Sequence, residues 1–137
     1  MDYEVIKIRT NMNPDSDVGG VSIIESEKDI SFDIKRFYFI HGVKKGISRG
    51  YHAHKALTQL LFCPYGEIKV ILDNGTETAE VVLDEPDKAL VVGPLLWHTM
   101  EWRSDYSILC VAASDYYDES DYIRNYDEFL GYIKDKA

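Results

Sequence analysis

Short apolar runs, rich in β-branched and aromatic residues, recur along this chain at intervals of roughly 8–12 residues, with turn signals between them. The most regular pair flanks Asp73-Asn74-Gly75, a sequence that favours a two-strand hairpin. About eight or nine such runs predict an all-β sandwich or barrel. Apart from the paired-His segment described below, strands are expected at residues 6–8, 21–25, 37–40, 60–63, 67–72, 78–83, 90–94 and 107–112, with a loop at 11–20.

Only the C-terminal segment carries a helical pattern. Its apolar residues recur near a 3.6-residue period, at Ile123, Tyr126, Leu130 and Ile133. Either Asp118 or Ser120 can cap the start of this helix, because a short polar side chain can accept a hydrogen bond from an unpaired N–H of the first turn. The 137 residues contain no repeat or linker-like tract, so we expect a single domain over 1–137.

The formal net charge of −9 argues against nucleic acid or an anionic membrane surface as a general partner. No apolar run approaches the ~20 residues that span a bilayer, and the first residues lack the basic and apolar regions of a signal peptide. Cys63 and Cys110 both lie in apolar runs, which favours buried free thiols over a disulfide. Together these features predict a cytoplasmic protein without a membrane or nucleic-acid partner.

The charge is distributed unevenly. Between residues 34 and 66 there is no Asp or Glu, although this window holds six of the 15 Lys and Arg residues and three of the four His residues. A basic window in an acidic protein is either a solvated face or a site for a small anion. Because the window coincides with a pair of closely spaced His residues, we favour the anion site.

The paired-His segment, residues 46–55, lies inside this window. If it forms a strand, His52 and His54 point to one face and Lys55 to the other, because residues two apart in a strand share a face. Arg49 lies three residues before the first His. Two imidazoles directed into an apolar β-structure are costly unless they are used. The segment is therefore a candidate site.

The spacing around this segment resembles the first motif of the cupin family, carried here by Gly46, His52, His54, Gln59 and Gly66. In metal-binding cupins a Glu stands at the position of Gln59, and a third His comes from a later strand, for which His98 is the candidate. A neutral amide is a poorer ligand for a divalent metal than a carboxylate. The resemblance implies a cupin jelly-roll β-barrel with a short C-terminal helix, and we favour a metal-free site without a cofactor over a His-only metal site.

A closer resemblance is to the dTDP-sugar 3,4-ketoisomerases, whose R-G-x-H-A-H-K motif is matched at residues 49–55. Further matches follow in family order at residues 35–38, 70–75, 94–97, 113–118 and 121–124, so the resemblance covers most of the chain. It implies a homodimer that acts on dTDP-4-keto-6-deoxyglucose without a metal. One departure is Val18, where the family often has Arg, and it leaves the stereochemistry of the product open. Within this dimer, residues 5–8 form a short apolar strand suited to pairing with an exposed edge.

The chemistry that the resemblance implies suits these residues. Moving a ketone from C4 to C3 requires removal of the C3 proton, an enediolate, and return of a proton to C4. His52 and His54 are the expected acid–base groups, because His transfers protons readily near pH 7. Tyr38 is either a catalytic helper with a polar tip or a core aromatic.

Four further residues are expected to bind substrate. Arg49 has the planar fork that suits a phosphate or an enediolate. Trp97 either stacks on the thymine base or fills the barrel, and His98 is either a wall of the site or a structural His. Gln59 completes the predicted substrate-binding set. Three rival functions remain open: a metal-dependent cupin oxygenase, a 3,5-epimerase of related fold, and a non-catalytic sugar-binding module.

Overall fold

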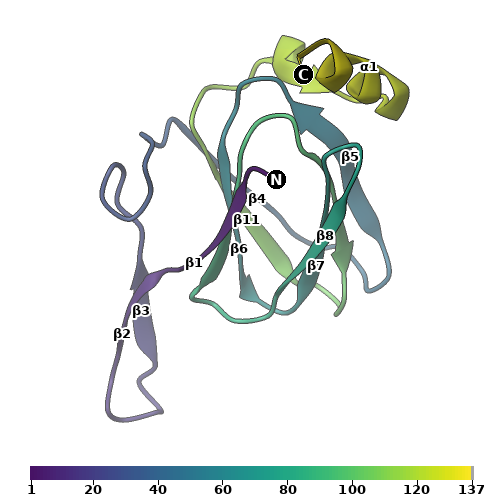
Figure 1. The fold of residues 1–137 in the computed structure, drawn as a ribbon. Coiled ribbons are helices and arrows are strands. Elements are labelled where there is room, and N and C mark those ends of the chain that lie inside the picture. The colour runs from purple at the N-terminus through teal and green to yellow at the C-terminus, as the bar shows by residue number, and fades with distance from the viewer. Residues whose placement is uncertain (137) are drawn as a thin grey trace.

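The computed structural model describes residues 1–136 and is built mostly of β-strands, with one C-terminal α-helix (Figure 1). The strands are β1 (Tyr3–Lys7), β2 (Arg9–Met12), β3 (Gly20–Ile23), β4 (Arg36–Ile40), β5 (Ser48–His54), β6 (Gln59–Tyr65), β7 (Ile68–Asp73), β8 (Thr78–Leu83), β9 (Lys88–Val92), β10 (Trp97–Trp102), β11 (Ile108–Ala113) and β12 (Tyr122–Ile123). The 3₁₀ turn η1 (Glu119–Asp121) precedes β12, and the helix α1 (Tyr126–Lys136) follows it. Within the described residues, no helix is both long enough and apolar enough to cross a membrane.

Two five-stranded antiparallel sheets form the body of the molecule. One has the order β1-β9-β6-β11-β4 and the other the order β12-β5-β10-β7-β8. Figure 1 shows the two sheets facing each other, with α1 lying across one end. The predicted cupin-type jelly roll with a C-terminal helix is therefore confirmed, and its two sheets form a sandwich.

The core lies between the two sheets. In β7 every second residue is buried, so its inward face consists of Ile68, Val70 and Leu72. This alternation is the two-residue period of a strand with one face against the core. Cys63 and Cys110 are buried and free, as the sequence predicted.

The C-terminal helix begins later than the sequence predicted. It starts directly after Asn125, whose side chain accepts a hydrogen bond from the Glu128 N–H at 3.0 Å. Asp118, one of the two expected caps, instead accepts a hydrogen bond from the Ser120 N–H at the start of η1. Ile123 belongs to β12, because pairing with β5 holds this part of the chain extended.

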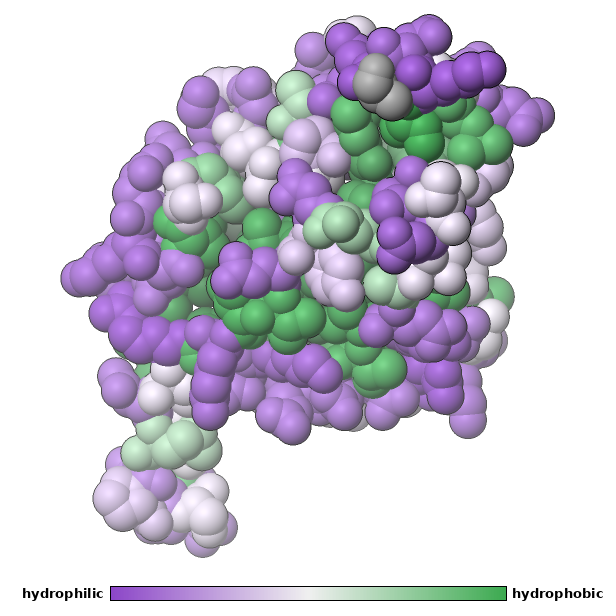
Figure 2. All heavy atoms as spheres, viewed as in Figure 1, coloured by the Kyte–Doolittle hydropathy of each residue, from purple (hydrophilic) through white to green (hydrophobic). Residues whose placement is uncertain are grey.

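The N-terminal region has two pairings that the sequence did not predict. β1 pairs with β9 of the same chain, so the strand expected to pair with a second subunit lies on the edge of the first sheet. Part of the loop expected at residues 11–20 is extended, because β2 pairs with β3 and the hydroxyls of Thr10 and Ser22 lie 2.8 Å apart across the pair. The resulting hairpin projects away from the sandwich, as Figures 1 and 2 both show.

A β-bulge interrupts β5 within the paired-His segment. Arg49 lies opposite Met100 and His52 opposite His98, so two residues of β5 face a single residue of β10 between these pairs. Gly50, the first of the two, has a φ of 101°. Paired residues on neighbouring strands share a face, and the extra residue therefore turns both Arg49 and His52 inward. Uninterrupted alternation would have placed these two side chains on opposite faces.

Replacement of Gly50 by alanine tests how far the bulge depends on glycine. An added Cβ would lie 2.9 Å from the His98 carbonyl oxygen and 3.2 Å from the Met100 side chain, whereas at Gly46, with a φ of 89°, no atom of the described residues beyond the adjacent ones lies within 4 Å. Both substitutions carry a backbone cost of about 1–2 kcal/mol. Only Gly50→Ala adds a clash, so it should lower the free energy of unfolding by a further ~1–3 kcal/mol. Urea denaturation of the two variants measures this difference, and equal losses would contradict it.

Candidate active site

Three imidazole rings meet on the inner face where β5 pairs with β10. The ring centroids of His52 and His54 lie 5.2 Å apart, and the ring of His98 lies 4.7 Å from the first and 5.9 Å from the second. The pair on β5 follows from strand alternation, and His98 joins it because the strand register places it directly opposite His52. We call these three residues the His cluster.

Each ring of the His cluster is oriented through its Nδ1 atom. The contacts are His52 Nδ1 to Gly50 O at 3.2 Å, His98 Nδ1 to Leu96 O at 2.9 Å, and His54 Nδ1 to Asp121 Oδ2 at 3.1 Å. Carbonyl and carboxylate oxygens only accept hydrogen bonds, so these partners assign the proton of each neutral ring to Nδ1. The Nε2 atoms then carry the lone pairs that are available for chemistry.

Burial keeps the three rings neutral. Loss of hydration lowers the pKa of His52 to about 3, and the neighbouring His98 and His54 act in the same direction. Burial likewise lowers the pKa of His54 to about 3, with His98 and Arg36 contributing. The pKa of His98 is also lowered by burial. At neutral pH each ring is therefore in its neutral form, with Nε2 unprotonated.

The same three rings can serve as metal ligands. One ligand nitrogen from each lies within 4.8 Å of the others, and imidazole suits zinc, iron and nickel. Gln59, at the carboxylate position of metal-binding cupins, instead donates from Nε2 to the Tyr38 hydroxyl at 3.2 Å. A metal at this site would therefore be held by three imidazoles.

A cavity of about 460 Å³ opens beside His52. Charged and aromatic side chains predominate in its lining, which consists of Arg36, Tyr38, Ile40, Arg49, Gly50, His52, Met100, Tyr117, Tyr122 and Arg124. A volume of this size is typical of small-molecule sites, and the cavity is the natural place for a ligand to meet the His cluster.

Three arginines surround this cavity: Arg36 from β4, Arg49 from β5, and Arg124 just after β12. The Arg36 guanidinium lies 5.2 Å from the Tyr38 ring centroid, and that of Arg124 lies 4.3 Å from the Tyr122 ring centroid. Guanidinium groups bind phosphate oxygens in a bidentate manner and stack on aromatic faces. The cavity therefore suits an anionic ligand, in keeping with the basic window of the sequence.

Two predicted site residues, Tyr38 and Gln59, lie one behind the other. Tyr38 lines the cavity, and burial raises the pKa of its hydroxyl, which therefore stays protonated at neutral pH. Gln59 is only 2% exposed and contacts the inner side of this hydroxyl. The structure thus assigns Gln59 to holding Tyr38 in place, because the tyrosine stands between the amide and the cavity.

Trp97 does not reach the cavity. It precedes His98 on β10, and successive strand residues point to opposite faces. Its ring packs at centroid distances of 5.3 Å from Tyr126 and 5.7 Å from Phe129, beneath α1. The expected stacking of Trp97 on a nucleotide base does not fit this placement, which is that of a core aromatic.

Five residues of the site were not predicted individually, and four of them come from the segment between β11 and α1. They are Arg36, Tyr117, Asp121, Tyr122 and Arg124. The local signals were the run of aromatic and charged residues at 113–124 and, for Arg36, the basic window at 34–66. The role of the four residues from the C-terminal run depends on the pairing of β12 with β5, which brings them to the His cluster.

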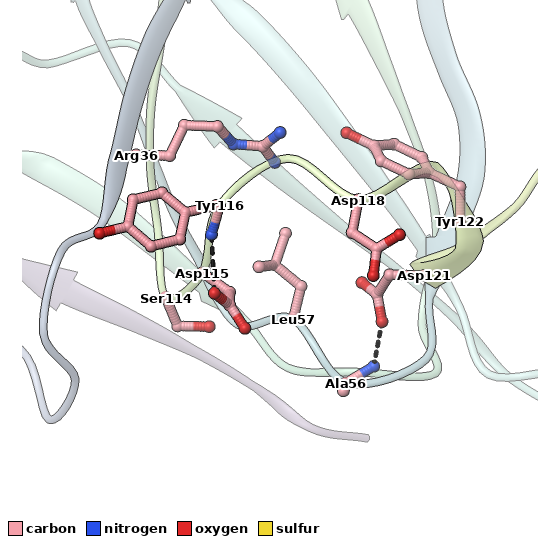
Figure 3. A pocket seen from close by; sticks show the side chains of 9 residues that line it. All are labelled: Arg36, Ala56, Leu57, Ser114, Asp115, Tyr116, Asp118, Asp121 and Tyr122. Carbon is pink, nitrogen blue, oxygen red and sulfur yellow. Dashed lines mark hydrogen bonds between the residues drawn. The ribbon is translucent and has the colours of Figure 1, made fainter.

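Asp121 lies on the wall of a second cavity of about 180 Å³, shown in Figure 3. Its Oδ1 accepts a hydrogen bond of 2.8 Å from the Ala56 N–H, while Oδ2 faces His54. Arg36 and Tyr122 line both cavities, so the two adjoin.

Comparison with known proteins gives concordant matches. The family model described as FdtA, WxcM-like C-terminal, matches residues 1–134. The chain is 50% identical over 115 residues, 84% of its length and 83% of the relative's, to the TDP-4-oxo-6-deoxy-alpha-D-glucose-3,4-oxoisomerase of Aneurinibacillus thermoaerophilus.

Solved structures agree with this match. A mutant of the 3,4-ketoisomerase QdtA from Thermoanaerobacterium thermosaccharolyticum, in complex with TDP-4-keto-6-deoxyglucose, matches with a TM-score of 0.93 and 40% identity, over 98% of this chain and 96% of that one. A 3,4-ketoisomerase from Helicobacter canadensis matches with a TM-score of 0.92 and 36% identity, over 98% of each chain. The extent of these matches shows that the chain belongs to the FdtA family of sugar 3,4-ketoisomerases.

Proposed function

We propose that this isomerase converts dTDP-4-keto-6-deoxy-D-glucose into a dTDP-3-keto-6-deoxyhexose by metal-free histidine acid–base catalysis. The observation that carries the proposal is the neutral His cluster, with its Nε2 lone pairs, beside an arginine-lined cavity. The substrate class is supported by the name of the Aneurinibacillus relative and by the ligand in the QdtA complex.

The reaction needs only proton transfers. An imidazole Nε2 removes the C3 proton, the C–H electrons form a double bond between C3 and C4, and the C4 oxygen is protonated to give a cis-enediol. The C3 hydroxyl then loses its proton while C4 accepts one at carbon, which leaves the ketone at C3. Substrate and product are isomers, so no oxidant or reductant is consumed. His52 lines the cavity and is our candidate for the base at C3, with His54 as the second proton-transfer group.

Neighbouring side chains would assist each part of the substrate. The protonated Tyr38 hydroxyl can donate a hydrogen bond to the enediolate, where negative charge develops. Arg36 and Arg49 can neutralise the diphosphate of the nucleotide, whereas the charge of Arg124 is already paired with Glu119. A metal-dependent cupin reaction is the second candidate, because the three imidazoles can also form a ligand set.

Removing either base tests the mechanism. His52→Asn and His54→Asn should each lower turnover at least ~100-fold, because loss of a general base typically costs this much. His41→Asn, at an exposed residue, is the matched control and should keep wild-type turnover. NMR of dTDP-4-keto-6-deoxyglucose with each protein in D₂O measures the reaction. Deuterium entering at C5 would indicate a 3,5-epimerase, and binding without any exchange would indicate a non-catalytic module.

Chelation and pH separate this mechanism from the metal-dependent one. Dialysis against EDTA should leave turnover unchanged, and activity that is lost on chelation and restored by a divalent metal would contradict the proposal. Because burial lowers the pKa of both His52 and His54, the neutral base should persist well below pH 6.5. Turnover should therefore be level between about pH 7 and 8 and decline only on the acidic side.

Arg49 and Lys55 form a matched pair for testing substrate binding. Arg49 lines the cavity, whereas the exposed Lys55 has its ammonium 5.7 Å from the centroid of the Tyr132 ring on α1. Arg49→Ala should weaken dTDP binding at least ~10-fold, because a hydrogen bond to a charged group contributes about 1.5–3 kcal/mol. Lys55→Ala should have little effect. Calorimetric titration with dTDP measures both, and equal, small effects would contradict the inward orientation of Arg49.

We also propose that the chain, as one cupin domain, forms a cytoplasmic homodimer. The exposed apolar side chains of Met12 and Val21 on the projecting hairpin, and of Phe37 and Phe39 on β4, support a second copy as the partner. The two free thiols support a reducing compartment. Light scattering at micromolar concentration should give twice the 15.7 kDa chain mass, and Phe39→Lys should shift it towards the monomer. A wild-type monomer would remove this proposal.

A further inference from the structure

We propose that Asp121 is a positioning residue for the ketoisomerase reaction, which fixes His54 in the Nδ1–H form so that Nε2 is the proton-transferring atom. This inference rests on the proposed function of the His cluster. It starts from one contact, the 3.1 Å distance between His54 Nδ1 and Asp121 Oδ2. The two residues are 67 positions apart in the sequence, so only the fold brings them together.

The Asp121 carboxylate is held before any substrate arrives. Its Oδ1 accepts a hydrogen bond of 2.8 Å from the Ala56 N–H, as Figure 3 shows. Its backbone carbonyl accepts a second bond, of 2.9 Å, from the Lys55 N–H. The following residue, Tyr122, pairs with His54 in the β12–β5 register. With one oxygen and the main chain both engaged, the other oxygen is directed at the imidazole.

The second ring nitrogen of His54, Nε2, lies on the side of the ring away from Asp121. This nitrogen is buried, and it has no hydrogen-bond partner among residues 1–136. An unpaired buried polar atom costs free energy and calls for an explanation such as a catalytic role. The opposite tautomer would set the lone pair of Nδ1 against the lone pairs of the carboxylate, so Asp121 selects the form with Nε2 unprotonated.

Asp121 also distinguishes His54 from the rest of the His cluster. The Nδ1 atoms of His52 and His98 contact neutral backbone carbonyls, whereas that of His54 contacts a carboxylate. A carboxylate stabilises the imidazolium that forms when Nε2 takes up a proton, and it does so more strongly than a carbonyl. Of the three rings, His54 is therefore the one whose protonated form would have a carboxylate partner.

Asp121→Asn separates this role from a structural one. The Asn amide oxygen can still accept the Ala56 N–H bond, so the turn is kept. The amide nitrogen then faces His54 and donates to Nδ1, which forces the imidazole proton onto Nε2. Asp118→Asn is the matched control, because Asp118 lies in the same cavity but its carboxylate bonds to Ser120.

The expected result is a tautomer change together with a loss of turnover. In ¹⁵N NMR, His54 should change from Nδ1–H to Nε2–H in Asp121→Asn, and turnover should fall at least ~100-fold. The melting temperature and the affinity for dTDP should stay close to wild type. Asp118→Asn should change neither the tautomer nor turnover. Asp121→Glu, which keeps a carboxylate, should keep the Nδ1–H form and recover a large part of the activity, and it serves as the test if Asp121→Asn does not fold.

Several outcomes would overturn the inference. They are an unchanged His54 tautomer in Asp121→Asn, a changed tautomer with full turnover, an equal loss of turnover in Asp118→Asn, or an Asp121→Glu variant no more active than Asp121→Asn. The tautomer is measured without substrate, so it tests Asp121 independently of the reaction. Failure of the proposed function would appear instead as full activity of His54→Asn.

Discussion

The antiparallel pairing of β5 with β10 is the interaction on which the site depends. Its register places His98 opposite His52, and strand alternation adds His54 on the same face. The bulge at Gly50 then turns Arg49 towards the same side, so that its guanidinium and the His52 imidazole line one cavity. A shift of this register by one residue would move these side chains to the opposite face and dismantle the site.

Burial gives the His cluster its chemical character. Burial removes water from all three imidazoles, and the protonated form of each ring loses more hydration free energy than the neutral form. Burial therefore lowers the pKa values and leaves the rings neutral. The backbone carbonyls and the Asp121 carboxylate compensate by bonding every Nδ1. The Nε2 atom of His54 stays unpaired, so no hydrogen bond within the described residues offsets the free-energy cost of burying it. Such an unpaired atom is expected where a site is kept ready for a ligand.

The segment between β11 and α1 links the site to the end of the sandwich. It supplies Tyr117, Tyr122 and Arg124 to the cavity and Asp121 to the His cluster. The short strand β12 holds this segment against β5, and α1 then covers Trp97 and the adjacent edge. Consecutive parts of the C-terminal region thus cover both faces of the β5–β10 pair. The segment before α1 completes the polar face that carries the His cluster, and α1 covers the apolar face that carries Trp97.

The sequence by itself determined the features that depend on local periodicity. Alternation and turn signals predicted an all-β sandwich or barrel, the i, i+2 spacing paired His52 with His54, and Cys63 and Cys110 were correctly predicted to be buried and free. The tertiary structure alone decided which distant residues join them. Strand register recruits His98, β12 pairing brings Asp121, and alternation along β10 sends Trp97 to the opposite face. A bulge or a long-range pairing leaves no period in the local sequence, because it is selected by packing between segments that lie far apart in the chain.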